Sequence, residues 1–445
     1  MSTRKTWAQR AFSIVTVFFL LGILSISSAR GDLLIFRRGG RLECQATIRG
    51  ETVVVASSRG PIEFPRADFV SITPSTPAED LWPPRREAAL RGTAQDRCDA
   101  VFWAMEHGLT FECEKLLRLC VSLDRDHLDP ALVRMLSALD RLSSPRPDPE
   151  LSSLTKVLPS RFESLSGRLF LLLHRKSSVE AADRLALLEQ VSTTFFLWTA
   201  AHGFELPAPE RKLVCIWFDD RDAYSNFLRL EGASAFADTS GYFHPTRRLI
   251  ALRDSPAESS ASPSFSSSRD SARLHLLSEQ TRLSIDLGAS AHEAIHLLVF
   301  STGLSPRCDS FPIWLHEGLA MQFECVRFGR WAGISQVSPI RYSHLRRLDS
   351  PALLSTLVRD LDFHLGYSYD RYAQAWSLVF HLLKHHPLSF FSYLDQLRVP
   401  VFEPPSDPSS RFLTLFQTCF GADLRSLEHS WRSSISSLRS PLDTP

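Results

Sequence analysis

Short hydrophobic runs separated by glycine dominate the chain between residues 32 and 74. Runs such as "LLIF" and "TVVV" alternate with turns at Gly39-Gly40, Gly50 and Gly60. Apolar and β-branched runs of this length, bounded by turn residues, are typical of strands joined by tight turns. Four or five strands at this spacing predict a small SH3-like β-barrel over residues 32–74.

The hydrophobic period then changes from strand-like to helical. The Pro-rich stretch "STPAEDLWPPRR" is expected to be a linker. Residues 94–123 place apolar positions at helical spacing and are interrupted at Gly108, which predicts a helical hairpin. The hairpin resembles one tetratricopeptide-like pair, although the repeat of about 34 residues is not found. Residues 75–143 are therefore expected to form a linker and a hairpin, and the polar residues 144–160 a second linker.

From about residue 161 the pattern is mixed. The runs "GRLFLLLHR", "KLVCIWF" and "RRLIALRD" predict strands, and residues 178–203 predict one long amphipathic helix. The Ser-rich region 255–280 lacks the apolar residues of a core and predicts a surface insertion. Further helices are expected at about 284–301, 312–328, 370–386 and 421–438. Residues 161–440 thus predict a mixed α/β domain with a mainly helical C-terminal half, in a multidomain α+β protein.

The N-terminal 31 residues have the pattern of a targeting segment. Basic residues precede the apolar run "AFSIVTVFFLLGILSI", and Ser27 and Ala29 suit a cleavage site. We expect a signal peptide and an exported protein, which is periplasmic, extracellular or on the cell surface. The apolar run is slightly short for a membrane helix. Contact with the membrane is expected only in the alternative case of an uncleaved anchor.

Composition and charge narrow the classes of function. Hydrophobic residues make up 44% of the chain and charged residues 22%, which is a normal globular balance. The formal net charge of +1 lacks the excess of positive charge that is typical of a nucleic-acid-binding protein. None of the eight cysteines has CxxC spacing, so a cysteine zinc cluster is not expected. Cys98 and Cys120 are expected at similar heights on the two helices of the hairpin, which predicts a disulfide between them.

The stretch "ASAHEAIHLLVF", residues 289–300, contains the first candidate chemistry. His292 and His296 are four positions apart, so on a helix they share one face and can reach one metal ion. Glu293 is rotated about 100° from His292, where it can take a proton without binding the metal. This is the HExxH arrangement of zinc metallopeptidases, although a chain with 15 histidines also produces such a match by chance.

A third ligand candidate lies in the stretch that begins at Phe311, "FPIWLHEGLAMQFE". Its first glutamate, Glu317, follows His296 after 20 intervening residues, enough to end one helix and start another near Pro312. Catalytic zinc usually has three protein ligands and a water molecule. The alternative is that Glu317 only complements the dipole at a helix N-terminus.

The motifs "HEAIH" and "WLHEGLA" together resemble those of the gluzincin metallopeptidases. The second is similar to the WLNEGxA element of the aminopeptidase branch. The resemblance implies that His292, His296 and Glu317 bind one Zn²⁺ and that Glu293 is the general base. "YAQAWSLVFHLL" resembles the family helix with the oxyanion-stabilising tyrosine, which implies Tyr372 as a second catalytic residue. An ordinary apolar stripe explains Tyr372 equally simply, with Tyr367 and Tyr369 as the other candidates.

Residues 161–438 also resemble a bacterial exported family of peptidase-MA-like proteins with unassigned function. The chain departs from the aminopeptidases, because "GYFHPTRRLIAL" stands where their GxMEN segment would be. This departure puts aminopeptidase specificity in doubt. Glu324 and His316 are candidates for supporting the ligands. The alternatives are a solvated glutamate and an ordinary surface or core histidine.

These observations predict a zinc-dependent metallopeptidase that hydrolyses peptide bonds through a metal-activated water. The expected partner is a peptide or protein substrate, and residues 32–143 are expected to have a partner that the sequence does not identify. The alternative is a non-catalytic exported binding protein with a structural or vestigial zinc site. A structural site requires ligands but no base, so the intact Glu293 favours the enzyme.

Overall fold

The structure is a computed structural model of the chain. It describes residues 31–57, 60–123, 128–143, 145–147, 154, 158, 162–255, 269–307, 309–348, 352–361, 363, 368–399, 407–440 and 442. Residues 1–30 of the predicted signal peptide therefore lie outside the described residues, as do Tyr367 and residues 256–268 of the predicted insertion, whereas Gly31 is the first residue of a strand. No helix in the described part is long and apolar enough to cross a bilayer.

Five antiparallel strands form a small N-terminal sheet with the order β4-β3-β2-β1-β5. They are β1 (Gly31–Phe36), β2 (Arg41–Arg49), β3 (Thr52–Val55), β4 (Ile62–Pro65) and, after a short 3-10 turn, β5 (Phe69–Pro74). The strands are as predicted, but the closed barrel is not: within the described residues no pairing joins β4 to β5. Leu276 from helix α8 (Arg269–Ser301) packs into the core of the sheet, so a helix covers it instead of barrel closure.

Helices α1 (Ala78–Arg91), α2 (Ala94–Glu106), α3 (Thr110–Leu123) and α4 (Pro130–Arg141) follow the sheet. The predicted hairpin is confirmed as α2 and α3, which turn at Gly108. The predicted linker over "STPAEDLWPPRR" is wrong, because most of that stretch lies in α1. Trp82 is buried there and its ring stacks on Trp103 at 6.1 Å, so packing outweighs the two prolines inside the helix.

The predicted disulfide between Cys98 and Cys120 is also wrong. Cys98 has a free, buried thiol, and its Sγ lies 3.6 Å from the carboxylate of Asp129. Asp129 caps the N-terminus of α4. The hydrophobic pattern does not predict this helix, and the Cys98 thiol contacts the residue that caps it.

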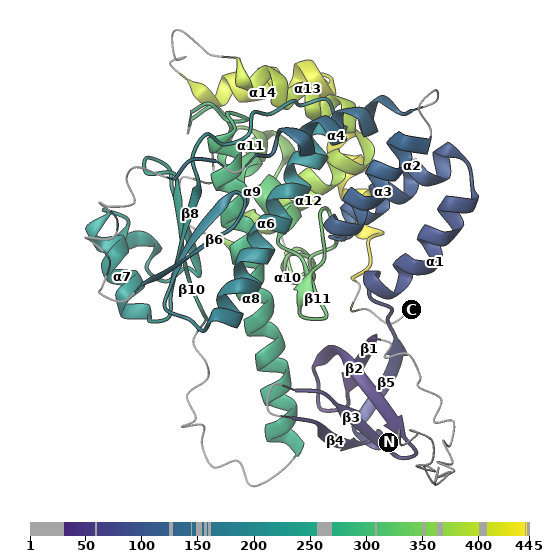
Figure 1. Cartoon of the computed structure of the whole chain (residues 1–445). Helices are drawn as coiled ribbons and strands as arrows, with labels where there is room; N and C mark the ends of the chain where they lie inside the picture. The colour runs from purple at the N-terminus through teal and green to yellow at the C-terminus, as the bar shows by residue number, and fades with distance from the viewer. Residues whose placement is uncertain are drawn as a thin grey trace, which may run out of the picture.

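A second five-stranded sheet has the order β6-β7-β8-β10-β9 and organises the larger domain. The strands are β6 (Glu163–Ser166), β7 (Phe170–His174), β8 (Leu213–Phe218), β9 (Gly241–His244) and β10 (Leu249–Arg253). The three central strands are parallel and were predicted from their apolar runs. The predicted long helix, α6 (Ser178–Ala201), packs with α8 on one face, and α7 (Arg221–Leu230) covers the other (Figure 1).

Helix α8 is longer than expected, and this changes the domain boundary. The helix predicted at 284–301 is confirmed, but α8 begins at Arg269, so residues 269–280 are not part of a surface insertion. This first third of α8 extends to the small sheet (Figure 1), where Gln280 Oε1 accepts a hydrogen bond from the Glu43 N–H at 2.7 Å. The small sheet is thus attached to the helix that carries both HExxH histidines.

The C-terminal half is mainly helical, as predicted. Its elements are α9 (Ile313–Ala320), a 3-10 turn (Met321–Phe323), β11 (Val326–Arg327), β12 (Arg330–Trp331), α10 (Pro339–Leu345), α11 (Leu354–Val358), α12 (Tyr369–His385), α13 (Pro387–Arg398), α14 (Pro408–Phe420) and α15 (Leu424–Ser436). The helix expected at 312–328 is wrong in length. The Trp331 indole donates a hydrogen bond to the Phe323 carbonyl at 2.5 Å, so the chain turns into the β11–β12 hairpin there.

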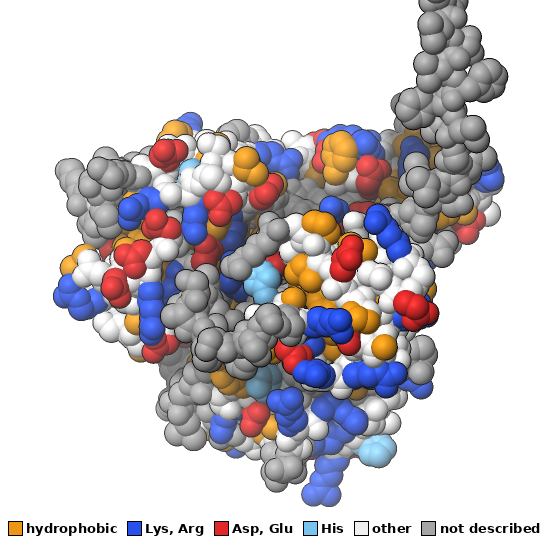
Figure 2. All heavy atoms as spheres, turned by 90° about the horizontal axis from the view of Figure 1, so that it is seen from below, with side chains coloured by type: hydrophobic (Ala, Val, Ile, Leu, Met, Phe, Trp, Pro, Cys, Tyr) orange, Lys and Arg blue, Asp and Glu red, His pale blue; other side chains and the backbone are white. Residues whose placement is uncertain are grey.

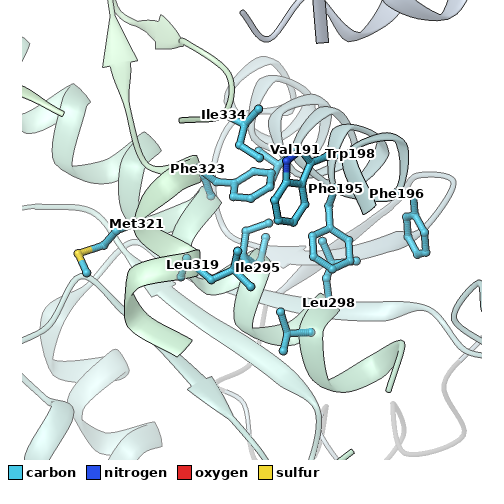
Figure 3. Close-up of a cluster of buried hydrophobic side chains, with 14 of the residues drawn as sticks. Val191, Phe195, Phe196, Trp198, Ile295, Leu298, Leu319, Met321, Phe323 and Ile334 are labelled. Carbon is cyan, nitrogen blue, oxygen red and sulfur yellow. The ribbon is translucent and has the colours of Figure 1, made fainter. Parts of the chain in front are cut away.

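One hydrophobic cluster joins α6, α8 and α9 (Figure 3). Val191, Phe195 and Trp198 come from α6, Ile295 and Leu298 from α8, and Leu319 from α9. The cluster holds the two helices of the candidate site against a common partner. Elsewhere, acidic and basic side chains are interspersed on the face seen in Figure 2, in keeping with the small net charge.

Candidate metal centre

The structure brings His292, His296 and Glu317 together. His292 Nε2 lies 3.1 Å from Glu317 Oε2 and 3.1 Å from His296 Nε2, and His296 Nε2 lies 3.6 Å from Glu317 Oε1. In a tetrahedral zinc site with ligands at about 2.1 Å, neighbouring ligand atoms are about 3.4 Å apart. The two distances to Glu317 involve different carboxylate oxygens, and single ligand atoms of the three residues all lie within 4.8 Å of one another. The three residues could therefore hold one metal ion, and they are of the types that bind zinc.

Helix α9 is placed by contacts at both of its ends. The carboxylate of Asp360 accepts hydrogen bonds from the N–H groups of Ile313 and Trp314, which satisfies the start of the helix. Gly318 lies against α12, where an added Cβ would come within 2.8 Å of the Ala375 carbonyl oxygen. A larger residue at 318 would push α9 away from α12, and Glu317 would move with it.

The ligands are coupled electrostatically in the metal-free protein. Burial opposes the charge on His292, but its interactions with the carboxylates of Glu317 and Glu324 outweigh burial and raise the pKa of His292 to about 10. Burial also opposes ionisation of Glu317, but the two histidines lower its pKa well below the usual range. A proton on His292 therefore supplies the positive charge that a metal ion would supply.

Zinc binding is therefore expected to strengthen as the pH rises. Below the raised pKa of His292 a proton competes with the metal, so the association constant should rise up to about tenfold per pH unit from pH 6 to 8. The measurement is a zinc competition titration at several pH values, with proton release determined by calorimetry in buffers of different ionisation enthalpy. The exposed His429→Ala variant should keep the same slope, and a pH-independent affinity would contradict the prediction.

Glu293 lies beside the three ligands, against the edge strand β9. The backbone N–H of Phe243 on this strand is among the groups that lower the pKa of its carboxyl. Burial raises the pKa of Glu293, the two histidines lower it, and Glu317 raises it, with a net upward shift. A carboxylate with a raised pKa accepts a proton near neutral pH more readily than an ordinary glutamate does.

Gly241 makes this position of Glu293 possible. A Cβ at residue 241 would lie 2.6 Å from Glu293 Cγ and 3.2 Å from Glu293 Cδ, both closer than ordinary van der Waals contact. The sequence does not indicate this role, because "GYFHPTRRLIAL" is notable there only as a departure from another motif. Only the packing of β9 on α8 shows why residue 241 has no side chain.

We expect Gly241→Ala to retain zinc and lose most hydrolytic activity, because the new methyl group displaces the Glu293 carboxylate. A displacement of about 1 Å can cost about 10²-fold in rate. The measurement is kcat/KM together with zinc content. An unchanged melting temperature would show that the Gly241→Ala protein is folded. A Gly241→Ala protein as active as the parent would rule out this steric role.

Glu324 faces the other side of His292. Its Oε2 lies 3.6 Å from His292 Nδ1. Arg341 on α10 holds the carboxylate in a two-pronged contact, at 2.7 and 3.0 Å. Burial opposes ionisation of Glu324, but Arg341 and His292 lower its pKa to about 2. The sequence indicates Glu324 as a candidate but does not indicate Arg341, which belongs to no motif. The packing of α10 places Arg341 next to Glu324.

Replacing Arg341 is expected to weaken zinc binding by about 10–100-fold, the range typical of residues that orient metal ligands. Arg341→Met keeps the length of the side chain but releases Glu324, whereas Arg341→Lys should restore part of the affinity. The measurement is the zinc dissociation constant. Arg347→Met, at an exposed position just after the same helix, is the matched control. Equal affinity in the Arg341→Met and Arg347→Met proteins would contradict the assignment.

The three remaining candidates, Tyr372, Tyr369 and His316, are not among the residues that converge on the candidate metal position. The Tyr372 ring lies 5.7 Å from the Arg341 guanidinium, so Tyr372 is linked to His292 through Arg341 and Glu324. Tyr369 is 54% exposed and stacks on His344. His316 is buried, with its Nε2 3.5 Å from Ser305 Oγ, and burial lowers its pKa to about 3.

Two histidines one turn apart, a glutamate from a neighbouring helix and a second glutamate beside them define a candidate His₂Glu metal centre. Residues 286–401 match a family model described as "Protein of unknown function (DUF1570)". The matched region includes His292, Glu293, His296, His316, Glu317, Glu324, Arg341 and Tyr372, and excludes the small N-terminal sheet. No curated protein matches the chain.

Proposed function

We propose that the protein is a zinc-dependent peptidase of the gluzincin type. The observation that carries the proposal is the convergence of His292, His296 and Glu317 at distances suited to one zinc ion, with Glu293 adjacent. Zinc, when bound, would polarise the substrate carbonyl and acidify a water molecule. The proposal includes export, which rests on the sequence of the first 31 residues.

Glu293 is the general base in this proposal. Its carboxylate takes a proton from the attacking water and later delivers it to the leaving amine. Glu324, held by Arg341, orients His292. Tyr372 is assigned to the developing oxyanion on the basis of family resemblance, with its ring next to Arg341.

The position of β9 supports a peptide as the substrate. This strand is the edge of its sheet, pairs with β10 and lies next to Glu293 at Gly241. An extended peptide binds such an edge by adding a strand, with backbone hydrogen bonds supplying affinity. A peptide aligned along β9 would place its backbone next to the proposed base.

Zinc analysis combined with a peptide-library digest tests the proposal. The purified protein is expected to contain about one zinc per chain and to cleave peptides, and His292→Ala is expected to lose both properties. Zinc without cleavage of any peptide would favour the alternative, a binding protein with a structural zinc site. Absence of zinc after gentle purification, with no uptake on titration, would reject the zinc peptidase and leave a binding protein with a vestigial site.

A further inference from the structure

One loop begins and ends at the two residues behind His292. Residues 325–338, which we call the 325–338 loop, follow Glu324 directly and end where Ser338 caps α10, the helix that carries Arg341. Both ends meet at one carboxylate: Ser338 Oγ lies 3.5 Å from Glu324 Oε1, and Arg341 holds the same group. A shift of the loop would therefore move Glu324 and Arg341 relative to each other.

The tip of the loop is a strained turn. Between β11 and β12 the chain reverses through Phe328 and Gly329, whose φ angles are +50° and +69°. Positive φ at both positions is the requirement of a common two-residue hairpin turn, which glycine meets without steric cost and a bulky residue does not. A strained residue of this kind persists only where the surrounding structure holds it. Phe328 therefore needs support from outside the hairpin.

The N-terminal sheet supplies this support (Figure 1). Glu43 of β2 forms an ion pair with Arg327 through Oε1, and its Oε2 accepts a hydrogen bond from the Phe328 N–H at 3.4 Å. The Phe328 ring packs on Gly31, where an added Cβ would lie 2.7 Å from Phe328 Cε1. Only 5% of the Glu43 side chain is exposed, so solvent and salt screen its contacts little. Both oxygens of one buried carboxylate thus hold the turn.

Further contacts fix Glu43 itself and the returning part of the loop. The Glu43 N–H donates a hydrogen bond to Gln280 of α8 at 2.7 Å, which anchors Glu43 to the helix with both histidines. After β12, the N–H of Ile334 donates a hydrogen bond to the Glu106 carbonyl at the end of α2, at 3.0 Å. Gly333 lies so close to this carbonyl that a Cβ would not fit. The sheet therefore holds the loop at its tip, and the helical hairpin holds it on its return.

We propose that Glu43 is a positioning residue for the candidate metal centre. By holding the turn it fixes the 325–338 loop, and the loop sets the place of the Glu324–Arg341 pair, which faces His292. A residue of the small N-terminal sheet then contributes to the site, although it is not one of the converging ligands. The expected effect on zinc rests on the proposed function, whereas the effect on the Glu324–Arg341 pair does not.

Zinc affinity in a double-mutant cycle tests this role in the full chain. Glu43→Gln keeps the size of the side chain and removes the charge that pairs with Arg327. The zinc dissociation constant should rise by about 3–10-fold, less than for Arg341→Met, because Glu43 acts through the loop. In the Arg341→Met background the same change should have little effect, since the pair that it positions is already broken. Independent structural defects would instead multiply their effects on the dissociation constant.

Hydrogen exchange in the metal-free protein is the second readout. Glu43→Gln should speed amide exchange in the 325–338 loop and also in α10, which carries Arg341. A change confined to the turn itself would be the result of local support alone. The matched control is Glu63→Gln, at an exposed glutamate on β4 of the same sheet. It should leave exchange and zinc affinity unchanged, and melting temperatures show that each variant is folded.

Each outcome bears on Glu43 or on the proposed function. Zinc affinity equal to that of the Glu63→Gln protein, an equal loss in both backgrounds, or unchanged exchange in α10 would overturn the positioning role. If the parent binds no zinc, the proposed function is rejected, and faster or unchanged exchange in α10 then supports or overturns the role of Glu43. Zinc binding without peptide cleavage would reject the peptidase and leave the positioning role standing.

Discussion

Replacing Glu293 with glutamine is expected to abolish peptide hydrolysis while zinc remains bound. The change preserves the size of the side chain but removes the group that accepts the proton, and loss of general acid–base assistance typically costs about 10²–10⁴-fold in rate. Glu293 is not one of the three residues whose ligand atoms converge on the candidate metal position. Zinc content should therefore equal that of the parent protein.

Peptide cleavage and zinc content measured on the same preparations test this prediction. Glu279→Gln is a matched control, because Glu279 lies on the same helix, near His275 and away from the site. It should cleave as fast as the parent. A Glu293→Gln protein that cleaves at the parent rate would remove Glu293 from the mechanism, and one that loses zinc would make it a ligand or a structural support.

Replacing Glu317 with alanine is expected to remove the zinc itself. It therefore differs from Glu293→Gln, which is expected to keep the zinc and lose only hydrolysis. The change removes one of three ligands, so the loss of zinc affinity should exceed the roughly 10–100-fold typical of residues behind the ligands. It also leaves His292 without the nearer of its two carboxylate partners, which lies 3.1 Å away. We expect His292→Ala to behave in the same way.

Zinc competition and melting temperature with and without added zinc check this second prediction. The parent should melt at a higher temperature in zinc, because a ligand that binds only the folded state stabilises it. Glu317→Ala and His292→Ala should lose most of this shift, while the exposed His429→Ala should retain it. Retention of the full shift by Glu317→Ala would show that zinc is bound without this carboxylate.

The N-terminal sheet is part of the same packed structure as the candidate metal centre. Leu276 completes the core of the sheet, and Glu43 on β2 forms an ion pair with Arg327 on β11. Both contacts attach the sheet to segments that continue into the site, since α8 carries the histidines and the β11–β12 hairpin follows Glu324. The sheet was expected to be a separate module because the Pro-rich stretch that follows it was expected to be a linker.

Local physics made several features predictable from the sequence. Residues four apart on a helix share a face, so "HEAIH" was sufficient to predict that His292 and His296 point to one place. Strands β7, β8 and β10 appear as continuous apolar runs because helices bury both faces of a parallel sheet. Gly108 accounts for the turn between α2 and α3, with φ at +72°.

The sequence by itself therefore determined the helix with both histidines, the central strands and, through a second motif, the approach of Glu317. The tertiary structure alone decided that α1 is helical, that α8 starts at Arg269, that Arg341 holds Glu324 and that Gly241 makes room for Glu293. Periodicity and motifs record which face of an element is buried and which residues lie within a few turns of one another. These other features depend on contacts between residues far apart in the sequence, and such contacts leave no local pattern.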